Sequence, residues 1–336
     1  MSRVAIVILN WNGINDTLSC LRSLLKQSYN DFQIIVVDNG STDNSKPLLD
    51  KYQKKYGNQI NIIYNPVNLG FAGGVNIGIK YALDNNFEYI ALFNNDAEAN
   101  KDWLAQLIKS IKPHNIGITT GLLLHGDGKT IDSTGDWYTN WGLPFPRNRG
   151  DKAQDAARAS LVFSASGGAS LYKTSILRDI GLFDEDFFAY YEDTDISFRA
   201  QLAGYKIAYN PKAVAYHKQG ATSKKLPGFT VYQTFKNLPL LFIKNVPFGL
   251  LLPIGIKFYF AYWLMFFNAI AKGSGKPAVK GLWVSLILSF KKLKERRIIQ
   301  KNKKVTTKYI KNILWYDLPP DQTGLRKLRK IFTGKN

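Results

Sequence analysis

The sequence predicts an α/β protein with a mostly parallel sheet flanked by helices, followed by a C-terminal helical extension that is basic and apolar. Strand-like and helix-like segments alternate between residues 4 and 111, and the strand-like segments are continuous apolar runs. Such alternation is typical of βαβ units, and such runs are typical of strands covered on both faces. The extension stands apart because residues 201–336 carry 26 of the 45 Lys and Arg residues but only 3 of the 25 acidic ones.

The alternating part contains four strands and four helices in order. The expected strands are Val4–Asn10, a strand from Phe32 that runs into a turn, Ile60–Pro66 and Tyr89–Asn94, and the expected helices are Asp16–Tyr29, Asn44–Tyr56, Val75–Asn85 and Asp102–Ile111. In open parallel sheets, ligands bind beyond the carboxyl ends of the strands. The polar residues that follow each strand are therefore the first candidates for a binding site.

The pattern becomes irregular between about Gly117 and Ala165, where the sequence is rich in Gly, Pro and aromatic residues. We expect a long loop there, and long loops in compact domains often act as lids over a site. Regular patterning returns with the glycine-rich turn SASGGASLY and a helix that starts near Thr174.

The region after about Pro227 contains apolar runs at Asn245–Ile256, Phe258–Ala271 and Leu282–Phe290. No uncharged stretch reaches the roughly 18–20 residues of a spanning helix. Three interpretations remain open: segments that lie in the membrane interface with lysines on anionic headgroups, a buried helical core or homodimer interface, and a spanning or re-entrant insertion. We expect two regions, residues 1–226 and residues 227–336.

The amino-acid composition bears on the cellular compartment in which the protein is expected and on its expected binding partners. The single cysteine, Cys20, excludes an internal disulfide, and the N-terminal apolar run is too short for a signal peptide, so we expect a cytoplasmic protein. The basic residues of the extension are interleaved with apolar runs and not with an aromatic stacking platform. Nucleic acid is therefore not an expected partner.

Two motifs follow the second and third strands. In VVDNGSTDNS, Asp38 could accept a hydrogen bond from a nucleobase, although capping of the next helix explains the same residues. In NLGFAGGVNIG, a glycine-rich turn at a helix start lets the backbone approach an anionic ligand, and helix packing is the alternative explanation. The dinucleotide fingerprint G-x-G-x-x-G is not present at this turn.

A third motif follows the fourth strand, where Asn94, Asn95 and Asp96 stand together. Hard divalent cations bind such oxygen ligands, but one carboxylate and an amide suffice only when substrate phosphate completes the shell. A polar turn is the other interpretation. His217, at the end of the strand-like run KIAYNPKAVAYH, is a candidate further ligand because imidazole binds Mn²⁺ and similar metals.

A fourth motif, FDEDFFAYYEDTDISFRAQLAG, places Glu192 and Asp193 near the start of a helix and among aromatic residues. Partial desolvation there would raise the pKa of a carboxyl group toward neutral pH, which suits a general base. Acidic residues that cap the helix N-terminus are the alternative.

Together and in this order, these motifs resemble family 2 glycosyltransferases. The resemblance covers about residues 3–225 and is carried by VILNWNG, VVDNGSTD, NLGFAGGVN, LFNND, GLFDEDFFAYYEDTD and AYHKQGATS. The pattern is most similar to the rhamnosyltransferase-like enzymes of bacterial surface polysaccharide assembly. The resemblance implies the glycosyltransferase-A fold and an inverting transfer of a sugar from a nucleotide-diphosphosugar, such as dTDP-rhamnose or a UDP-sugar.

The resemblance also implies a role for each matching residue. Asp193 would be the general base, Glu192 would hold the acceptor, and Asp96 would anchor a Mg²⁺- or Mn²⁺-bound diphosphate with His217 nearby. Donor binding falls to Asn10, Asp38, Asn68, Asn76, Asn94 and Asn95, with Asp38 on the nucleobase. Trp137, in the irregular region, is a candidate acceptor-binding residue. Asn94 departs from the family, in which many members have Asp there.

The expected partners follow from this resemblance. They are a nucleotide-sugar donor, a lipid-linked saccharide acceptor and an anionic membrane surface, which together imply a peripheral location on the inner face of the cell membrane. A non-catalytic nucleotide-sugar-binding scaffold is the alternative function. A processive synthase is not favoured, because the sequence contains neither several spanning helices nor a Q-x-x-R-W-type motif.

Overall fold

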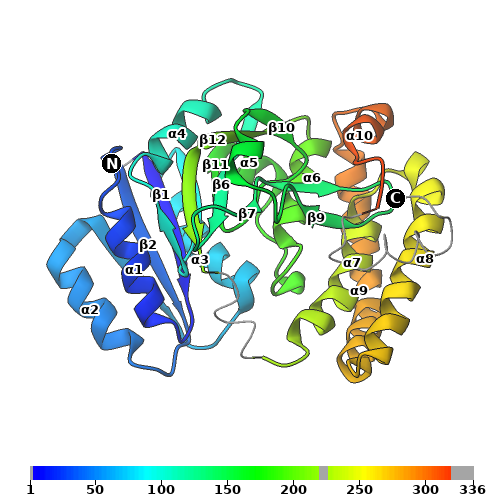
Figure 1. The fold of residues 1–336 in the computed structure, drawn as a ribbon, viewed down its shortest axis with the longest axis horizontal. Coiled ribbons are helices and arrows are strands. Elements are labelled where there is room, and N and C mark those ends of the chain that lie inside the picture. Colours follow the sequence, from blue (N-terminus) through cyan, green and yellow to red (C-terminus); the bar gives the residue numbers. More distant parts are fainter. Residues whose placement is uncertain (1–2, 219–225, 319–336) are drawn as a thin grey trace.

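A computed structural model describes residues 3–218 and 226–318, and it contains a ten-stranded mixed sheet in this part of the chain (Figure 1). Its main path runs β10-β12-β6-β11-β4-β1-β2-β3, with β5 paired to β12 and β7 paired to β6. Strands β8 and β9 form a separate pair. The strands are β1 Val4–Asn10, β2 Phe32–Asn39, β3 Ile60–Asn65, β4 Tyr89–Asn94, β5 Ala97–Ala99, β6 Ile116–His125, β7 Ile131–Ser133, β8 Asp136–Tyr138, β9 Pro144–Pro146, β10 Ser160–Val162, β11 Ala169–Lys173 and β12 Lys206–His217.

The register of the parallel strands brings the predicted polar ends together. β1 lies between β2 and β4 and is parallel to both, with Asn10 opposite Asp38 and Leu9 opposite Asn94. β3 continues the parallel part beyond β2, whereas β11 runs antiparallel to β4 and β6. The predicted four-strand parallel core is therefore confirmed, and its carboxyl ends meet at one edge.

Helices cover both faces of the sheet, as the apolar strands predict. One apolar layer packs α1, α2 and α4 against the sheet, and a second packs α3, α5 and α6 against the other face. These helices are α1 Ile14–Leu24, α2 Ser45–Tyr56, α3 Gly70–Asp84, α4 Trp103–Ile111, α5 Thr174–Ile180 and α6 Glu192–Leu202.

Helix α3 begins five residues before its predicted start at Val75, because glycine allows an unusual close approach there. Gly70 has a φ of 73°, and a Cβ at this position would collide with the backbone and ring of Phe188. The later glycines face the sheet, where a Cβ at Gly74 or Gly78 would meet the side chains of β1. The glycine-rich motif thus serves helix packing along most of its length and a tight loop contact at Gly70.

The long loop expected between Gly117 and Ala165 is wrong for most of that range. Ile116–His125 is the buried central strand β6, and four shorter strands follow it. Gly121 lies where β6 passes the backbone of Ala213, which leaves no room for a Cβ. The sequence shows no strand periodicity here, because the later strands are only three residues long and are separated by turns rich in Gly, Pro and aromatic residues.

The C-terminal helices stand together beside the sheet (Figure 1). They are α7 Phe229–Asn245, α8 Phe248–Ala271, α9 Gly275–Lys301 and α10 Thr307–Ile313. The two apolar runs on either side of Lys257 are not separate segments, because α8 continues through both and contains Pro253. By length and composition alone, α8 is the one helix of the described residues that could cross a membrane, a test that a soluble core helix also passes.

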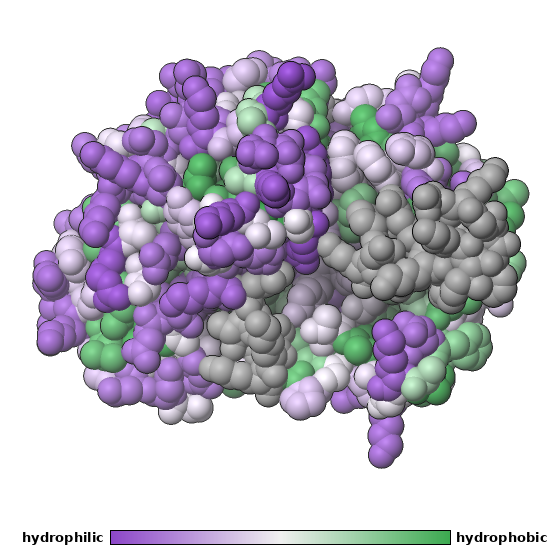
Figure 2. Space-filling view, viewed as in Figure 1, coloured by the Kyte–Doolittle hydropathy of each residue, from purple (hydrophilic) through white to green (hydrophobic). Residues whose placement is uncertain are grey.

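Helices α8 and α9 expose a large apolar surface. Only 33% of the most apolar 18-residue window of α8 is buried. Apolar colour reaches the outer edge of the molecule on the side of these helices in Figure 2, although grey atoms cover part of this face. The exposed residues include Phe248, Leu252, Tyr259, Phe260, Leu264 and Phe267 on α8, and Trp283, Leu286, Ile287, Phe290 and Ile298 on α9.

A buried ion-pair network holds α7 and α9 against the turn at residues 184–187, which precedes α6. Lys292 of α9, fully buried, lies 2.5 Å from Asp184 and 2.7 Å from Asp186. Lys244 of α7 contacts Asp184 at 2.6 Å and Asp195 of α6 at 3.0 Å. The C-terminal helices are therefore held to the sheet domain by charge as well as by apolar packing.

Replacing Lys292 with Met tests this network. The variant leaves Asp184 and Asp186 largely buried without their shared cation, so the free energy of unfolding should fall by about 3–5 kcal/mol. Lys291→Met is the matched control, because Lys291 also lies 2.7 Å from Asp186 but its side chain is 59% exposed. We expect a loss of about 0–1 kcal/mol for the control. Equal losses in urea unfolding of the two variants would contradict this role for Lys292.

Candidate active site

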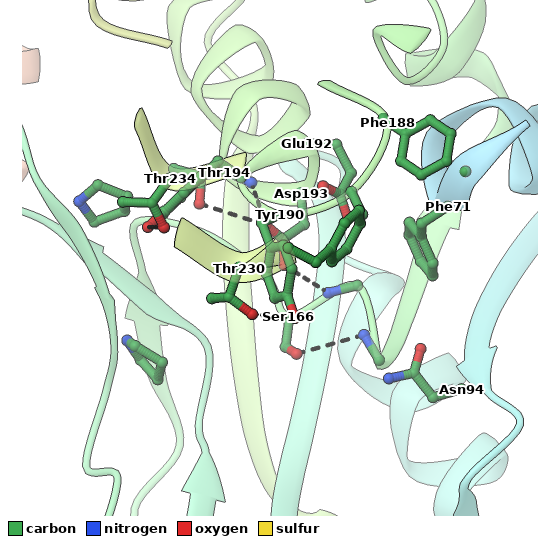
Figure 3. A pocket seen from close by; sticks show the side chains of 18 of the residues that line it. Phe71, Asn94, Ser166, Phe188, Tyr190, Glu192, Asp193, Thr194, Thr230 and Thr234 are labelled. Carbon is green, nitrogen blue, oxygen red and sulfur yellow. Dashed lines mark hydrogen bonds between the residues drawn. The ribbon is translucent and has the colours of Figure 1, made fainter. Parts of the chain in front are cut away.

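A cleft of about 950 Å³ opens at the carboxyl edge of the parallel strands (Figure 3). Its walls come from the ends of β1, β2 and β4, from the 166–168 turn, from the start of α6 and from α7 and α8. The predicted residues that line it are Asn68, Asn94, Asn95, Asp96, Glu192, Asp193 and His217. The fold therefore brings together residues that lie up to 149 positions apart in the chain.

Asn10 and Asp38 lie behind the cleft wall. The Asn10 amide donates to Asp38 Oδ1 at 2.6 Å and to Ser45 Oγ at 3.0 Å, and Asp38 Oδ2 accepts from the Ser41 backbone N–H at 3.2 Å. Both side chains are buried. In this arrangement they shape the 39–45 turn, and the neighbouring Asn39 reaches the cleft instead.

Asn76 and Trp137 also lie away from the cleft wall. The buried Asn76 amide donates to the Phe183 carbonyl at 2.8 Å, and its oxygen accepts from the Phe183 N–H at 3.1 Å, so it ties α3 to the turn before α6. The Trp137 ring packs against Trp315, with 5.3 Å between the ring centroids. Its neighbour Asp136 lines the cleft, because adjacent strand residues point to opposite sides.

His217 lies between two carboxylates at one end of the cleft. Its Nδ1 is 2.7 Å from Asp132 Oδ2, and its Nε2 is 3.0 Å from Asp96 Oδ1. Burial lowers the pKa of His217, but the hydrogen bonds to Asp132 and Asp96 outweigh burial and raise it to about 9. Asp132 also pairs with Arg149 at 2.9 Å. The imidazole is thus oriented by one carboxylate and presented to the other.

The donor set around His217 fits a divalent cation. Asp96 offers a carboxylate oxygen, His217 Nε2 faces it, and the Asn94 amide is 3.4 Å from the same nitrogen. Asp132 on the far ring nitrogen provides the carboxylate–histidine arrangement that commonly orients a metal-binding imidazole. Two protein ligands plus substrate phosphate is a common way to hold Mg²⁺ or Mn²⁺.

A second group of acidic residues is close enough to hold a metal ion but is already neutralised. Ligand oxygens of Asp184, Asp186 and Glu295 lie within 4.8 Å of one another. The Lys292 ammonium contacts all three, at 2.5, 2.7 and 2.9 Å. An ammonium group therefore already satisfies these carboxylates, and the Asp96–His217 end of the cleft has the better donor set.

Asp193 lies in the middle of the cleft wall, at the second position of α6, as the sequence predicted for the start of this helix. Its Oδ2 accepts from the Gly167 N–H at 3.1 Å, and its Oδ1 accepts from the Thr194 N–H at 2.7 Å (Figure 3). Burial raises the pKa of Asp193, although these backbone hydrogen bonds oppose the shift. The carboxylate is thus fixed in orientation and is more basic than an exposed aspartate.

Glu192 precedes Asp193 and is nearly fully buried, although it also contributes to the cleft wall. Its Oε2 has no hydrogen-bond partner among the described residues. Burial, together with repulsion from the Asp193 charge, raises the pKa of Glu192 to about 8. Glu192 is therefore a neutral carboxylic acid at neutral pH, with an O–H group to donate.

The turn before α6 has an unusual backbone. Phe188, Tyr190 and Tyr191 have φ values of 63°, 69° and 72°. The Phe188 carbonyl accepts from the Ala72 N–H at 3.1 Å, which docks the turn on the start of α3. Asn237 of α7 donates to backbone carbonyls of the turn, including that of Tyr190 at 2.8 Å.

Sequence reasoning missed several residues that build the cleft. Asp132, Asp136 and Arg149 fell in the expected loop, and no local period identified them. Asn39 was overlooked beside Asp38, although it binds Asn68 at 2.9 Å. The residues of α7 and α8 were missed because their apolar runs indicated a membrane or an interface. The DSTGD segment, with acids four apart before the hairpin, was the one available signal.

Comparison with known families and curated proteins agrees with this geometry. Residues 5–181 match glycosyl transferase family 2, and residues 126–271 match glycosyl transferase family group 2. The low-salt glycan biosynthesis hexosyltransferase of Haloferax volcanii is 25% identical over 240 residues, which cover 70% of this chain and 73% of that protein. The poly-β-1,6-N-acetyl-D-glucosamine synthase of Staphylococcus epidermidis is 28% identical over 204 residues, covering 60% of this chain but only 46% of the synthase.

Solved structures share the fold. A Pyrobaculum calidifontis mannosyltransferase in complex with GDP-mannose and Mn²⁺ has a TM-score of 0.57 at 15% identity, covering 100% of this chain and 88% of that one. Staphylococcus aureus TarS residues 1–349 in complex with UDP has a TM-score of 0.54 at 15% identity, covering 89% of this chain and 90% of that one. From its family match and its fold, the chain belongs to glycosyl transferase family 2 and is a glycosyltransferase with the glycosyltransferase-A fold.

Proposed function

We propose that this glycosyltransferase carries out a metal-dependent, inverting transfer of a sugar from a nucleotide-diphosphosugar to a hydroxyl group of a lipid-linked glycan acceptor. One observation carries the proposal: the Asp96–His217 pair and the Asp193 carboxylate line the same cleft. The relatives in glycan biosynthesis support the pathway class, and the structural relatives with bound GDP-mannose or UDP support the donor class. We propose dTDP-rhamnose or a UDP-sugar as the donor.

The Asp96–His217 end is proposed to bind the donor diphosphate. A Mg²⁺ or Mn²⁺ ion held by Asp96 and His217 would neutralise the charge that develops on the departing diphosphate. Asn94 and Asn95 contribute polar groups beside it, and Asn39 and Asn68 continue the wall toward the nucleoside. Asp132 holds a proton on His217 Nδ1, and a bound cation would displace the second proton, which the raised pKa keeps on Nε2 at the cleft side.

Asp193 is proposed to be the general base. The acceptor hydroxyl oxygen forms a bond to the anomeric carbon while the bond from that carbon to the diphosphate oxygen breaks. The hydroxyl proton passes to the Asp193 carboxylate, and the nucleoside diphosphate leaves with the bonding electron pair. The raised pKa of Asp193 supports this role, because a more basic carboxylate takes up a proton more readily near neutral pH.

Glu192 is proposed to hold the acceptor as a hydrogen-bond donor. Its Oε2 lacks a partner among the described residues, and its raised pKa keeps the carboxyl group protonated at neutral pH. A neutral acid beside Asp193 adds no second negative charge to the base. It can donate to an acceptor oxygen while Asp193 accepts the proton.

We further propose a peripheral, cytoplasmic location on the inner face of the cell membrane. The exposed apolar surface of α8 and α9 supports it, because contiguous apolar patches of this extent mark interaction surfaces. Exposed basic residues border the surface, including Lys291, Lys294 and Arg297 on α9. Apolar side chains edged by lysine and arginine suit a monolayer that contains anionic lipids.

Donor binding and turnover should separate in two variants. Asp193→Asn should retain thermal stabilisation by a UDP- or dTDP-sugar with Mn²⁺ but lose about 10²–10⁴-fold in kcat, because only the proton acceptor is removed. Asp96→Asn should lose the part of the stabilisation that requires Mn²⁺. A thermal-shift panel of UDP-, dTDP- and GDP-sugars with and without metal measures the first property. Stabilisation by none of these donors would contradict the proposed function.

The burial of Glu192 predicts a pH-dependent stability difference. A carboxyl group whose pKa rises from near 4.5 to about 8 on folding stabilises the protein fully only below pH 4.5. That stability is lost as the pH rises toward 8, by up to about 1.4 kcal/mol per pH unit. Glu192→Gln cannot ionise, so its stability relative to wild type should increase between about pH 5 and pH 8 and then level off.

The control for this titration is Glu185→Gln, which changes an exposed glutamate in the turn that precedes α6. Because the Glu185 side chain is 59% exposed, this variant should not reproduce the pH-dependent gain of Glu192→Gln. Chemical unfolding at a series of pH values provides both curves. Parallel curves for the Glu192→Gln and Glu185→Gln proteins would show that Glu192 is not held neutral in the fold.

Membrane association should depend on the apolar surface of α9. Trp283→Glu should weaken binding to phosphatidylglycerol-containing vesicles, measured by co-sedimentation, by about tenfold or more. A tryptophan side chain that becomes partly buried in the membrane contributes at least ~1.5 kcal/mol to binding. Leu161→Glu is the control, because Leu161 is also more than half exposed but lies on β10. An equal loss of binding in both variants would contradict the role of this surface. Equal binding to neutral and anionic vesicles at every salt concentration would contradict its dependence on lipid charge.

A further inference from the structure

The cleft has a second end that is built by the C-terminal helices. From the donor end, the wall passes from Asn94, whose N–H donates to the Gly168 carbonyl at 2.9 Å, to Gly167 and Asp193. It then reaches Tyr190, whose hydroxyl is 3.4 Å from Thr230 Oγ1 at the start of α7. Beyond that contact the lining is mostly apolar and includes Phe229, Val231, Met265 and Ala269, while its polar members are Thr234, Asn268 and Lys272.

This second end is mostly apolar and joins an exposed apolar stripe of α8. Met265, Ala269 and Lys272 line the cleft at helical spacing, which places them along one face of α8. Successive helix positions differ by about 100°, so Leu264, one turn before the cleft-lining Asn268, borders that face, whereas Phe267 lies on the opposite side of the helix. Leu264 is 46% exposed. An apolar chain that leaves the cleft here would therefore continue onto the surface of α8.

One cation at this end is available for a ligand. Arg149 and Lys272 are the Arg and Lys side chains among the described residues that line the cleft. Arg149 is engaged by Asp132 at 2.9 Å. Lys272 follows the last residue of α8, is exposed, and forms no ion pair with a described residue. An anionic group on a ligand would meet this ammonium at the mouth of the cleft.

We propose that the α7–α8 end of the cleft binds the lipid-phosphate part of the acceptor. The Lys272 ammonium contacts the phosphate, the sugar to be extended lies toward Asp193, and the lipid chain passes Met265 and Leu264 onto the surface of α8. This inference rests on the proposed function, because it assigns the acceptor's place in the same cleft. It also gives α8 a role in substrate binding, because the apolar surface of this helix extends the acceptor site.

The chemistry of this end favours an amphiphile over a free sugar or a protein segment. A free saccharide needs several polar partners, and the lining beyond Thr230 and Thr234 is largely aliphatic and aromatic. A second copy of the chain would bring more lysines toward Lys272, because the C-terminal part is strongly basic. A phosphate-linked lipid satisfies both the cation and the apolar stripe.

Farnesyl diphosphate is a soluble probe for this subsite, and titration of the full-length protein in EDTA avoids metal-dependent binding at the donor end. Lys272→Gln should raise the Kd for the probe about 5- to 20-fold, as expected for loss of a hydrogen bond to a charged group. Lys276→Gln, which removes an exposed lysine that does not line the cleft, should leave the Kd within about twofold.

The apolar arm of the test uses farnesol, which lacks the phosphate. Leu264→Ser should weaken binding of both farnesol and farnesyl diphosphate about 3- to 10-fold, while Phe290→Ser on α9 should not. Inorganic pyrophosphate should bind more weakly than farnesyl diphosphate and should respond to Lys272→Gln alone. This pattern separates the two halves of the subsite.

Several results would overturn the inference. They are equal effects of Lys272→Gln and Lys276→Gln, no probe binding by the wild type, or displacement of the probe by UDP with Mn²⁺, which would assign it to the donor end. A dimer that Leu264→Ser dissociates would assign the surface to a second copy. Nucleotide-sugar stabilisation with Mn²⁺ is measured in the same proteins, so failure of the donor reaction is distinguished from failure of this subsite alone.

Discussion

The position of the two cleft carboxyl groups, Glu192 and Asp193, depends on how α7 holds the turn at residues 187–191. Three residues of this turn adopt positive φ angles, which non-glycine residues avoid at a cost on the order of 1–3 kcal/mol each. The buried Asn237 amide lies within hydrogen-bond distance of three of its carbonyls, at 2.8 to 2.9 Å, and the Lys236 ammonium binds two preceding carbonyls. Glu192 and Asp193 follow immediately, so a helix outside the sheet domain determines the position of the proposed general base.

The ion-pair network extends this dependence to α9. Asp184 and Asp186, just before the turn, are bound by Lys292, while Lys244 links Asp184 to Asp195 on α6. Removal of any one partner would leave another charge buried, which makes such a network a stringent constraint on geometry. Because α9 also carries exposed apolar residues, the surface proposed to meet the membrane and the turn that places Asp193 belong to one packed unit.

Much of the fold could be predicted from the sequence, because periodicity is a local signal. Continuous apolar runs identified β1 to β4, and their polar ends identified Asn94 to Asp96 as cleft residues. Contacts between distant segments left no such signal. Asp132 reaches His217 across 85 residues, and Asn237 reaches the turn across about 50. For the same reason, the sequence predicts a loop where short carboxylate-bearing strands lie, and it does not distinguish Trp137, which packs on Trp315, from Asp136, which lines the cleft.

The layout of the cleft explains why an inverting reaction suits this architecture. A single displacement requires the acceptor oxygen and the departing diphosphate to lie on opposite sides of the anomeric carbon. The chain of contacts from Asn94 through Gly167 to Asp193, and from Tyr190 to Thr230, sets the proposed diphosphate end and the α7–α8 end apart, with the proposed base between them. A donor that enters from the strand ends and an acceptor that enters along α8 would thus meet at Asp193 from opposite directions, as inversion demands.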